Sequence, residues 1–256
     1  MKTALITGAT QGIGLELAKL FAQNGNNLIL IARDEIRLQS IAKELTLNNI
    51  TVKTFAKDLS IIDDAQYIYE ELKAQHIAVD YVVNNAGYGI NDQYVDIDWR
   101  KEESMFNLNM ITVAYFTKMF ARDMKERNFG RILNVGSTAS FQPGPYMAGY
   151  CATKAFVLSL SEAVNYELRK SNVSVSTLCP GVTDSKFHAF AKTESTMMSK
   201  RLSHATPLAV AKYGFKIMMQ KKSLGIYGIS NKIMVFSTRL TCRKMVVALS
   251  AQLLRR

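Results

Sequence analysis

The chain has 256 residues, 48% of them hydrophobic and 21% charged, which is typical of a globular protein and excludes a largely disordered chain. The net charge of +11 is concentrated toward the C-terminus, because residues 195–256 contain twelve Lys or Arg and no Asp or Glu. No apolar run reaches the ~20 residues that span a bilayer, and three scattered cysteines indicate a reducing compartment. The first residues enter a strand directly, so we expect no signal peptide and a cytoplasmic protein.

The N-terminal segment predicts a strand, a glycine turn, a helix and a second strand. An apolar run at 3–7 leads into a turn over 8–14, the apolar residues of 13–24 have helical spacing, and a second apolar run follows at 27–32. Glycines at such a turn let backbone amides at a helix N-terminus approach a pyrophosphate, which indicates dinucleotide binding. An ordinary glycine-rich turn is the alternative. The candidate residues are Gly8, Thr10, Gln11, Gly12, Ile13 and Gly14.

Arg33 follows the second predicted strand, where dinucleotide-binding folds select the adenosine ribose. A carboxylate at this place binds a free 2′-hydroxyl, whereas a planar guanidinium suits a 2′-phosphate. Arg33 therefore predicts NADP(H) as the cofactor, with Asp34 as a competing partner for the charge.

The rest of the chain alternates between apolar runs and helical patterns. Continuous apolar strands interleaved with helices predict a parallel sheet covered on both faces, and right-handed crossovers make it doubly wound. We expect an α/β chain with a single Rossmann domain over 1–256 and a seven-stranded sheet. The further strands are predicted at 51–55, 79–83, 131–135, 173–178 and 224–227, and the further helices near 34–46, 61–75, 103–127, 148–170 and 207–220.

Tyr150 and Lys154 are four residues apart in the helix predicted at 148–170, so both side chains lie on one side of it. An ammonium beside a phenol favours the phenolate. Lys154 is therefore predicted to lower the pKa of Tyr150 and make it a proton donor and acceptor near neutral pH. The same spacing occurs by chance on amphipathic helices, so its meaning depends on the residues around it.

Polar and small residues follow the ends of several predicted strands, which is where ligands bind in an α/β sheet. Asp58 follows the third strand, and the run Asn84-Asn85-Ala86-Gly87 follows the fourth. Ser137 follows the fifth strand, and Pro180-Gly181 follows the sixth. The carboxyl ends of parallel strands share one edge of the sheet, so we expect these residues to converge on one crevice.

These motifs, in this order and spacing, resemble those of the short-chain dehydrogenase/reductase family over about residues 2–185. The resemblance implies a hydride-transfer enzyme, similar to hydroxysteroid and 3-oxoacyl reductase-like members. It implies catalytic roles for Asn109, Ser137, Tyr150 and Lys154. It also implies that NADP(H) is bound by Gly8, Thr10, Gln11, Gly12, Ile13, Gly14, Arg33, Asp58, Leu59, Asn85, Ala86, Gly87, Tyr150, Lys154, Pro180, Gly181, Thr183 and Ser185.

The resemblance further implies how the site divides the chemistry. Ser137 holds the substrate oxygen, Tyr150 transfers the proton, and Lys154 also binds the nicotinamide ribose. Thr183 or Ser185 contacts the nicotinamide carboxamide, and the reaction needs no metal.

Two of the implied roles have a structural alternative. Asn109 holds water in a proton relay according to the resemblance, but a polar residue in an apolar helix is also explained as a hydrogen-bonded core amide. Asp58 binds the adenine amino group according to the resemblance, but Asp58 or Ser60 is equally suited to cap the helix that follows.

Residues 186–206 resemble the family's segment that closes over substrate. The apolar residues Phe187, Phe190, Met197 and Met198 predict an apolar substrate, with helix packing as the alternative. We therefore expect interconversion of a ketone and a secondary alcohol on a steroid-like or long acyl compound. A second hypothesis is reduction of 3-oxoacyl groups on an acyl carrier protein, whose acidic surface would suit the basic C-terminal quarter. A third is a non-catalytic, NADPH-binding scaffold or sensor on a membrane.

The tail at 229–256 combines apolar and basic residues. It is predicted either to attach to an anionic membrane surface or to pack on the core or another subunit with its basic side in solvent. It lacks an aromatic ladder for stacking on bases, so no nucleic-acid partner is expected. As is usual in the family, the helices at 103–127 and 148–170 are expected to form a homodimer or homotetramer.

Overall fold

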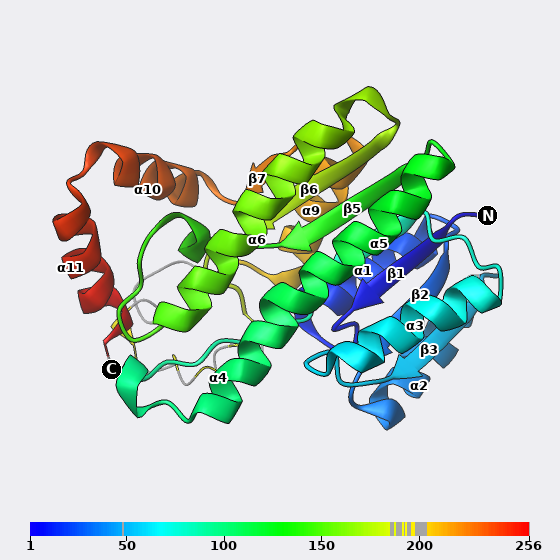
Figure 1. The fold of residues 1–256 in the computed structure, drawn as a ribbon, viewed down its shortest axis with the longest axis horizontal. Helices are drawn as coiled ribbons and strands as arrows, with labels where there is room; N and C mark the ends of the chain where they lie inside the picture. The colour runs from blue at the N-terminus through cyan, green and yellow to red at the C-terminus, as the bar shows by residue number, and fades with distance from the viewer. Residues whose placement is uncertain are drawn as a thin grey trace.

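Seven parallel strands form one sheet in the computed structural model of the chain, which describes residues 1–47, 49–184, 187, 191, 193, 196, 197 and 204–255 (Figure 1). The strand order is β3-β2-β1-β4-β5-β6-β7, so the order reverses its direction between β1 and β4. The predicted doubly wound Rossmann fold is confirmed. The strands are β1 (Thr3–Thr7), β2 (Asn27–Ala32), β3 (Val52–Ala56), β4 (Tyr81–Asn84), β5 (Gly130–Val135), β6 (Val173–Cys179) and β7 (Leu224–Ile226).

Helices connect the strands and cover both faces of the sheet. The longer helices are α1 (Gly12–Gln23), α2 (Glu35–Thr46), α3 (Ile62–Ala74), α4 (Trp99–Phe106), α5 (Thr112–Glu126), α6 (Ala148–Glu167), α9 (Pro207–Met219), α10 (Ile229–Leu240) and α11 (Arg243–Leu254). Shorter helical segments are η1 (Tyr94–Asp96), η2 (Asn107–Ile111), η3 (Thr138–Phe141) and η4 (Leu168–Lys170).

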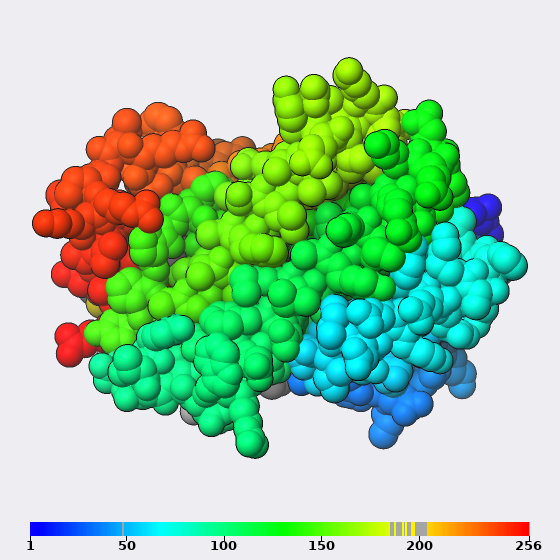
Figure 2. Space-filling model, viewed as in Figure 1, coloured from blue at the N-terminus to red at the C-terminus, as the bar shows by residue number. Residues whose placement is uncertain are grey.

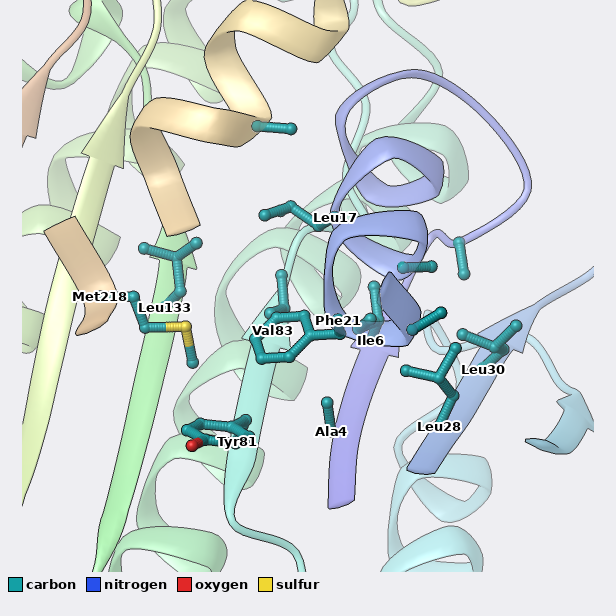
Figure 3. Packing of buried hydrophobic residues seen from close by; sticks show 14 of the residues in the cluster. Ala4, Ile6, Leu17, Phe21, Leu28, Leu30, Tyr81, Val83, Leu133 and Met218 are labelled. Atoms are coloured by element: carbon teal, nitrogen blue, oxygen red, sulfur yellow. The ribbon is translucent and has the colours of Figure 1, made fainter. Parts of the chain in front are cut away.

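Alternate residues of the central strands belong to two separate hydrophobic cores. Ala4 and Ile6 of β1 pack with residues of α1, α2 and α9, whereas Leu5 between them packs with residues of α3 and α5. Figure 3 shows the first core, where Leu17 and Phe21 of α1 lie over the sheet. Because both faces are covered, each strand must be apolar on both sides, which explains the unbroken apolar runs in the sequence.

The segment predicted as one helix at 103–127 is interrupted, which corrects that prediction. α4 is followed by the π-helical segment η2 before α5 begins. A π-helical turn shifts the helical phase, and such segments are frequent at functional sites. No Gly or Pro occurs between 103 and 127, so the usual sequence marks of an irregular helix are missing.

The tail at 229–256 folds into two helices, α10 and α11, which lie together at one end of the molecule (Figure 1). Figure 2 shows their side chains, in orange and red, forming that end of the surface. Among the described residues, no helix has both the length and the apolar composition needed to cross a bilayer.

Candidate active site

A cavity of about 500 Å³ opens at the carboxyl ends of the parallel strands. Its wall includes residues that directly follow each of β1 to β6. The reversal of strand order between β1 and β4 leaves room for a ligand at this edge of a doubly wound sheet. The predicted site residues that line the cavity are Gly8, Thr10, Gln11, Gly12, Ile13, Arg33, Asp58, Leu59, Asn85, Ala86, Gly87, Ser137, Tyr150, Lys154, Pro180, Gly181 and Thr183.

The turn between β1 and α1 requires glycine for two different reasons, a left-handed backbone at Gly8 and Gly12 and a close approach at Gly14. Gly8 has a φ of 66°, in the left-handed region, and its N–H donates to the Ile31 carbonyl oxygen at 2.9 Å. Gly14 is not part of the cavity wall. It lies behind the turn, where a Cβ would overlap the Gly8 carbonyl oxygen and the side-chain nitrogen of Asn85. The start of α1 therefore approaches this turn more closely than a side chain at Gly14 would allow.

Thr7 and Asn85 hold the turn against the end of β4. The Thr7 hydroxyl accepts hydrogen bonds from the N–H groups of Asn85 and Ala86, both at 2.9 Å. The Asn85 side chain donates to the carbonyl oxygens of Thr7 at 2.9 Å and Gly8 at 3.3 Å. These roles were not predicted. The signal available in the sequence was that Thr7 ends the first strand immediately before Gly8.

The N-terminus of α1 fits the pyrophosphate of a dinucleotide. Gln11 at the N-cap makes no side-chain cap hydrogen bond, and the first two residues of the helix, Gly12 and Ile13, line the cavity. Uncapped amides at the positive end of the helix dipole favour an anion. The chain thus has the glycine cradle and the helix N-terminus that dinucleotide binding requires.

Arg33 lines the cavity after β2, with 66% of its side chain exposed. Its guanidinium lies 3.6 Å from Oδ2 of Asp58. Asp34, the expected competitor, instead caps α2 by accepting a hydrogen bond from the Arg37 N–H at 3.0 Å. The Arg37 side chain donates to the Thr10 carbonyl oxygen at 2.7 Å, which brings a second guanidinium to the glycine turn. The role of Arg37 was not predicted.

Asp58 stabilises the turn that follows β3. Its Oδ1 accepts hydrogen bonds from the Ser60 N–H at 3.0 Å and the Ser60 hydroxyl at 2.8 Å. The N-cap residue of α3 is Ile61, without a side-chain cap, so neither Asp58 nor Ser60 caps that helix. The Leu59 carbonyl oxygen accepts from the Thr112 hydroxyl at 2.6 Å, which ties this turn to α5.

Ser137 and Tyr150 meet from different elements. Ser137 follows β5 as the N-cap of η3, where its hydroxyl accepts a hydrogen bond from the Ala139 N–H at 3.1 Å. Tyr150 is buried in the first turn of α6 and lies close enough to Ser137 for the serine to affect the pKa of the phenol. Burial raises the pKa of the phenol well above its ordinary value, and the nearby Ser137 opposes this rise. The phenol is therefore protonated at neutral pH, which is the form that donates a proton.

Lys154 lies one helical turn after Tyr150 and is also buried. Its Nζ donates to the Val135 carbonyl oxygen at 2.8 Å and lies 5.8 Å from the centre of the Tyr150 ring. Burial lowers the pKa of Lys154 to about 8, because the ammonium loses hydration. The expected fall in the Tyr150 pKa is not found in the isolated chain, where the pKa is raised. The phenolate loses its own hydration on burial, and this is the largest influence on the Tyr150 pKa.

Asn109 lies in the π-helical segment η2 and is fully buried. Its Oδ1 accepts from the Tyr88 N–H at 3.2 Å, and its Nδ2 donates to the Tyr88 carbonyl oxygen at 2.9 Å and the Thr153 hydroxyl at 3.2 Å. These bonds fit a satisfied core amide. A Cβ on Gly87 would lie 2.9 Å from Asn109 Oδ1 and 3.5 Å from Lys154 Nζ, so both residues lie beside the same glycine. The proton-relay role of Asn109 stays a prediction.

The segment after β6 forms another wall of the cavity. The Thr138 N–H donates to the Pro180 carbonyl oxygen at 2.9 Å, and the Thr183 hydroxyl donates to the Gly181 carbonyl oxygen at 3.1 Å. Of the two hydroxyls predicted for the carboxamide, Thr183 lines the cavity, whereas Ser185 lies outside the described residues.

Only part of the predicted lid at 186–206 is described. Phe187 lines the cavity, and its ring centre lies 5.3 Å from that of Tyr150. Phe190 and Met198 lie outside the described residues. Phe187, one residue of the predicted lid, thus packs against Tyr150.

Helices α10 and α11 line the cavity as well, which the sequence did not predict. The Asn91 side chain donates to the carbonyl oxygen of Leu254 at 3.0 Å, across 163 residues of chain. Such a contact has no local sequence signal because it depends on tertiary packing. The two helices contribute Asn231, Met234, Ser250, Leu253 and Leu254 to the wall.

The sequence and the fold both have known counterparts. Residues 2–196 match the family model described as short chain dehydrogenase. A very-long-chain 3-oxoacyl-CoA reductase of Mycosarcoma maydis is 35% identical over 179 residues, which cover 68% of this chain and 51% of that protein. A short-chain dehydrogenase from Sphingobium yanoikuyae in complex with NADPH is 26% identical, with a TM-score of 0.84 over 94% of both chains. A short-chain dehydrogenase/reductase from Burkholderia phymatum in complex with NAD has the same fold, with 24% identity and a TM-score of 0.82 over 92% of both chains.

The chain belongs to the short-chain dehydrogenase family. It spans about half the length of the 3-oxoacyl-CoA reductases that it matches. The two solved structures hold different dinucleotides, NADPH in one and NAD in the other.

Replacing Gly14 with Ala should strongly weaken dinucleotide binding, because the added Cβ would overlap backbone atoms of Gly8 and push α1 away from the turn. We expect the free energy of unfolding to fall by about 1–3 kcal/mol. The dissociation constant for NADPH, measured by fluorescence titration, should rise by at least about tenfold, or 1.4 kcal/mol. Gly214→Ala is the matched control, since its Cβ would meet the end of the Leu178 side chain at 2.7 Å, far from the turn. Equal NADPH affinities for both variants would contradict the packing argument.

Replacing Lys154 with Met should stabilise the folded chain at pH 7, because it removes a buried charge. The pKa of Lys154 is about 8 in the folded chain against an ordinary 10.5, so the cost of burying the ammonium is full below pH 8 and disappears toward pH 10.5. The stability advantage of the variant should therefore shrink by roughly 2–3 kcal/mol between about pH 7 and pH 10.5, as measured by urea unfolding. The exposed Lys125→Met is the control, and a pH-independent advantage for Lys154→Met would show that the ammonium is not desolvated.

Proposed function

We propose that the chain uses NADP(H) to interconvert a ketone and a secondary alcohol on a hydrophobic substrate, such as a steroid-like or long acyl compound. The observation that carries this proposal is that Ser137, Tyr150 and Lys154 line one cavity that begins at a glycine turn, with Tyr150 and Lys154 one turn apart on α6. A phenol, a hydroxyl and an ammonium in this arrangement provide proton transfer and orientation for a carbonyl oxygen.

Each of the residues Ser137, Tyr150 and Lys154 has a separate role in the proposed reaction. A reduced nicotinamide supplies, when bound, a hydride for the carbonyl carbon. The Ser137 hydroxyl donates to the carbonyl oxygen and orients it toward Tyr150. Because the phenol is protonated at neutral pH, Tyr150 gives its proton to the oxygen as negative charge develops there. The Lys154 ammonium then stabilises the resulting phenolate through its charge, since a buried cation acts over several ångströms.

The dinucleotide would be held by the elements around the cavity. The N–H groups at the start of α1 would donate hydrogen bonds to the pyrophosphate, and Lys154 would donate to hydroxyls of the nicotinamide ribose. Arg33 receives the 2′-phosphate, which its exposure and its place after β2 support. Asp58 accepts from the adenine amino group, and Thr183 contacts the carboxamide. The NADPH-bound relative agrees with the proposed preference.

The wall of the cavity supports an apolar substrate. Its side chains near Tyr150 include Met147, Phe187 and Leu254, and Met234 lines another part of the wall. Burial of a long apolar substrate against such a wall is favourable by about 25 cal/mol per Å². The name of the Mycosarcoma maydis relative favours a more specific second candidate, a 3-oxoacyl thioester.

We also propose that the chain assembles as a homodimer or homotetramer through the helices around α5 and α6. Large apolar side chains are exposed there, namely Ile111 in η2 and Phe156 and Tyr166 in α6. Exposed apolar side chains gathered on neighbouring helices are characteristic of subunit contacts.

Replacing Tyr150 with Phe should lower kcat for carbonyl reduction by about 10²–10⁴-fold while leaving NADPH affinity within a factor of a few. The phenyl ring keeps the packing with Phe187 but has no proton to give. Turnover is measured as NADPH oxidation on a panel of steroid ketones, 3-oxoacyl-CoA thioesters and small aldehydes. Tyr146→Phe, four residues earlier in the chain, is the control. Full activity of Tyr150→Phe would end the mechanism, and an inactive wild type on every carbonyl would favour the non-catalytic scaffold.

Replacing Arg33 with Ala should weaken NADPH by about 10–100-fold and NADH much less, since a charge-assisted hydrogen bond contributes about 1.5–3 kcal/mol. Isothermal titration with both dinucleotides measures the ratio. Arg37→Ala is the matched comparison, because Arg37 donates to Thr10 at the same turn. A selective loss of NADPH in Arg37→Ala and equal losses in Arg33→Ala would assign the phosphate to Arg37 instead.

A further inference from the structure

The outer side of α10 is a ridge of exposed apolar side chains. Ile229, Ile233, Phe236 and Leu240 follow each other at intervals of four, three and four residues, which places them along one side of the helix. Their exposed fractions are 60% to 77%, whereas Val235, on the opposite side, is 5% exposed. An isolated exposed apolar residue needs no explanation, but four aligned on one helix do.

The next helix also has exposed apolar side chains. Met245 and Leu249, one turn apart on α11, are 57% and 54% exposed. Val246, Ser250 and Leu254 of the same helix are buried, so α11 also has an inner and an outer side. We call the six exposed apolar residues of the two helices the C-terminal ridge.

Basic residues border the C-terminal ridge. Lys232 lies three residues after Ile229 and four before Phe236, so its side chain is next to both on the helix surface. Arg239 follows Phe236 by three residues, and Arg243 and Lys244 begin α11. All four basic residues are exposed, and residues 195–256 contain no Asp or Glu to neutralise them.

The inner sides of the same helices are fixed to the body of the protein. Asn231 and Met234 of α10 and Leu253 and Leu254 of α11 line the cavity. Asn91 donates to the Leu254 carbonyl oxygen at 3.0 Å. The helices therefore present their outer sides in a defined orientation beside the cavity.

We propose that the C-terminal ridge docks on an anionic phospholipid bilayer, with α10 and α11 lying in the plane of the interface. An amphipathic helix with apolar residues on one side and Lys or Arg at its border binds such a surface by apolar burial and by attraction to anionic lipid. Each of the two helices has 12 residues, fewer than the ~20 that span a bilayer, so they lie on it.

Charge favours the bilayer over a second copy of the chain. A two-fold contact brings the same surface of both copies together, so the four basic residues of one ridge would face those of the other without a carboxylate from this segment. An anionic bilayer offers negative charge at the border and hydrocarbon for the apolar residues. The docking does not depend on which reaction takes place in the cavity.

The full chain tests the proposal by flotation with vesicles of phosphatidylcholine, with or without added phosphatidylserine. We expect binding that increases with phosphatidylserine and decreases with salt. Ile229→Ser/Ile233→Ser should weaken binding at least about tenfold. The matched pair Ile36→Ser/Ile61→Ser, exposed on the opposite part of the molecule in α2 and before α3, should bind like the wild type.

A second pair of variants separates charge from apolar insertion. Lys232→Gln/Lys244→Gln should weaken binding to phosphatidylserine vesicles about tenfold and leave binding to phosphatidylcholine unchanged. Lys43→Gln/Lys125→Gln, exposed on α2 and α5, should change neither. Urea unfolding and reduction of a water-soluble ketone check that each variant is folded.

Tryptophan fluorescence provides an independent readout. Trp99 is the single tryptophan of the chain, so Phe236→Trp in a Trp99→Phe background places one fluorophore on the ridge. Brominated lipid should quench it in phosphatidylserine vesicles. Absence of both flotation and quenching overturns the proposal. Binding to an acidic carrier protein without vesicle binding, or dissociation of an oligomer by the Ile229→Ser/Ile233→Ser change alone, overturns it in favour of a protein partner.

Discussion

The cavity depends on one close approach, that of α1 to the turn after β1. Gly14 leaves no side chain between the helix and the Gly8 carbonyl oxygen, and the Asn85 side chain joins the same carbonyl group to the end of β4. β1 and β4 are the neighbouring strands between which the order of the sheet reverses. The Thr7 hydroxyl and Asn85 thus set both the position of the helix N-terminus and the width of the crevice in front of it.

Burial determines the proton chemistry on the other side of the cavity. Tyr150 and Lys154 are both removed from water, which raises the pKa of the phenol and lowers that of the ammonium. Both shifts favour the neutral form, so the pair is not a simple phenolate and ammonium in the isolated chain. The Val135 carbonyl group holds the Lys154 ammonium in place, and Ser137 lies near the Tyr150 phenol. The fold therefore sets the positions of both side chains before a ligand binds.

Sequence periodicity predicted the regular parts of the fold well. Strands covered on both faces must be apolar throughout, and amphipathic helices have apolar residues at intervals of three and four. It did not predict η2, since nothing between 103 and 127 breaks the helical pattern. It also did not decide whether the tail at 229–256 attaches to a membrane surface or packs on the core or another subunit. α10 and α11 have one side against the cavity and one side in solvent, so each interpretation describes one side of the same helices.

The sequence by itself determined the kind of site, because the residue types at strand ends and the spacing of Tyr150 and Lys154 are local properties. It determined Arg33 as a candidate for the 2′-phosphate for the same reason. The tertiary structure alone decided that Arg33 faces Asp58 and not Asp34, that Asn109 is held by Tyr88 and Thr153, and that the C-terminus returns to the cavity through Asn91. Each of these contacts joins residues distant in the chain, and the packing that brings them together leaves no mark in a short stretch of sequence.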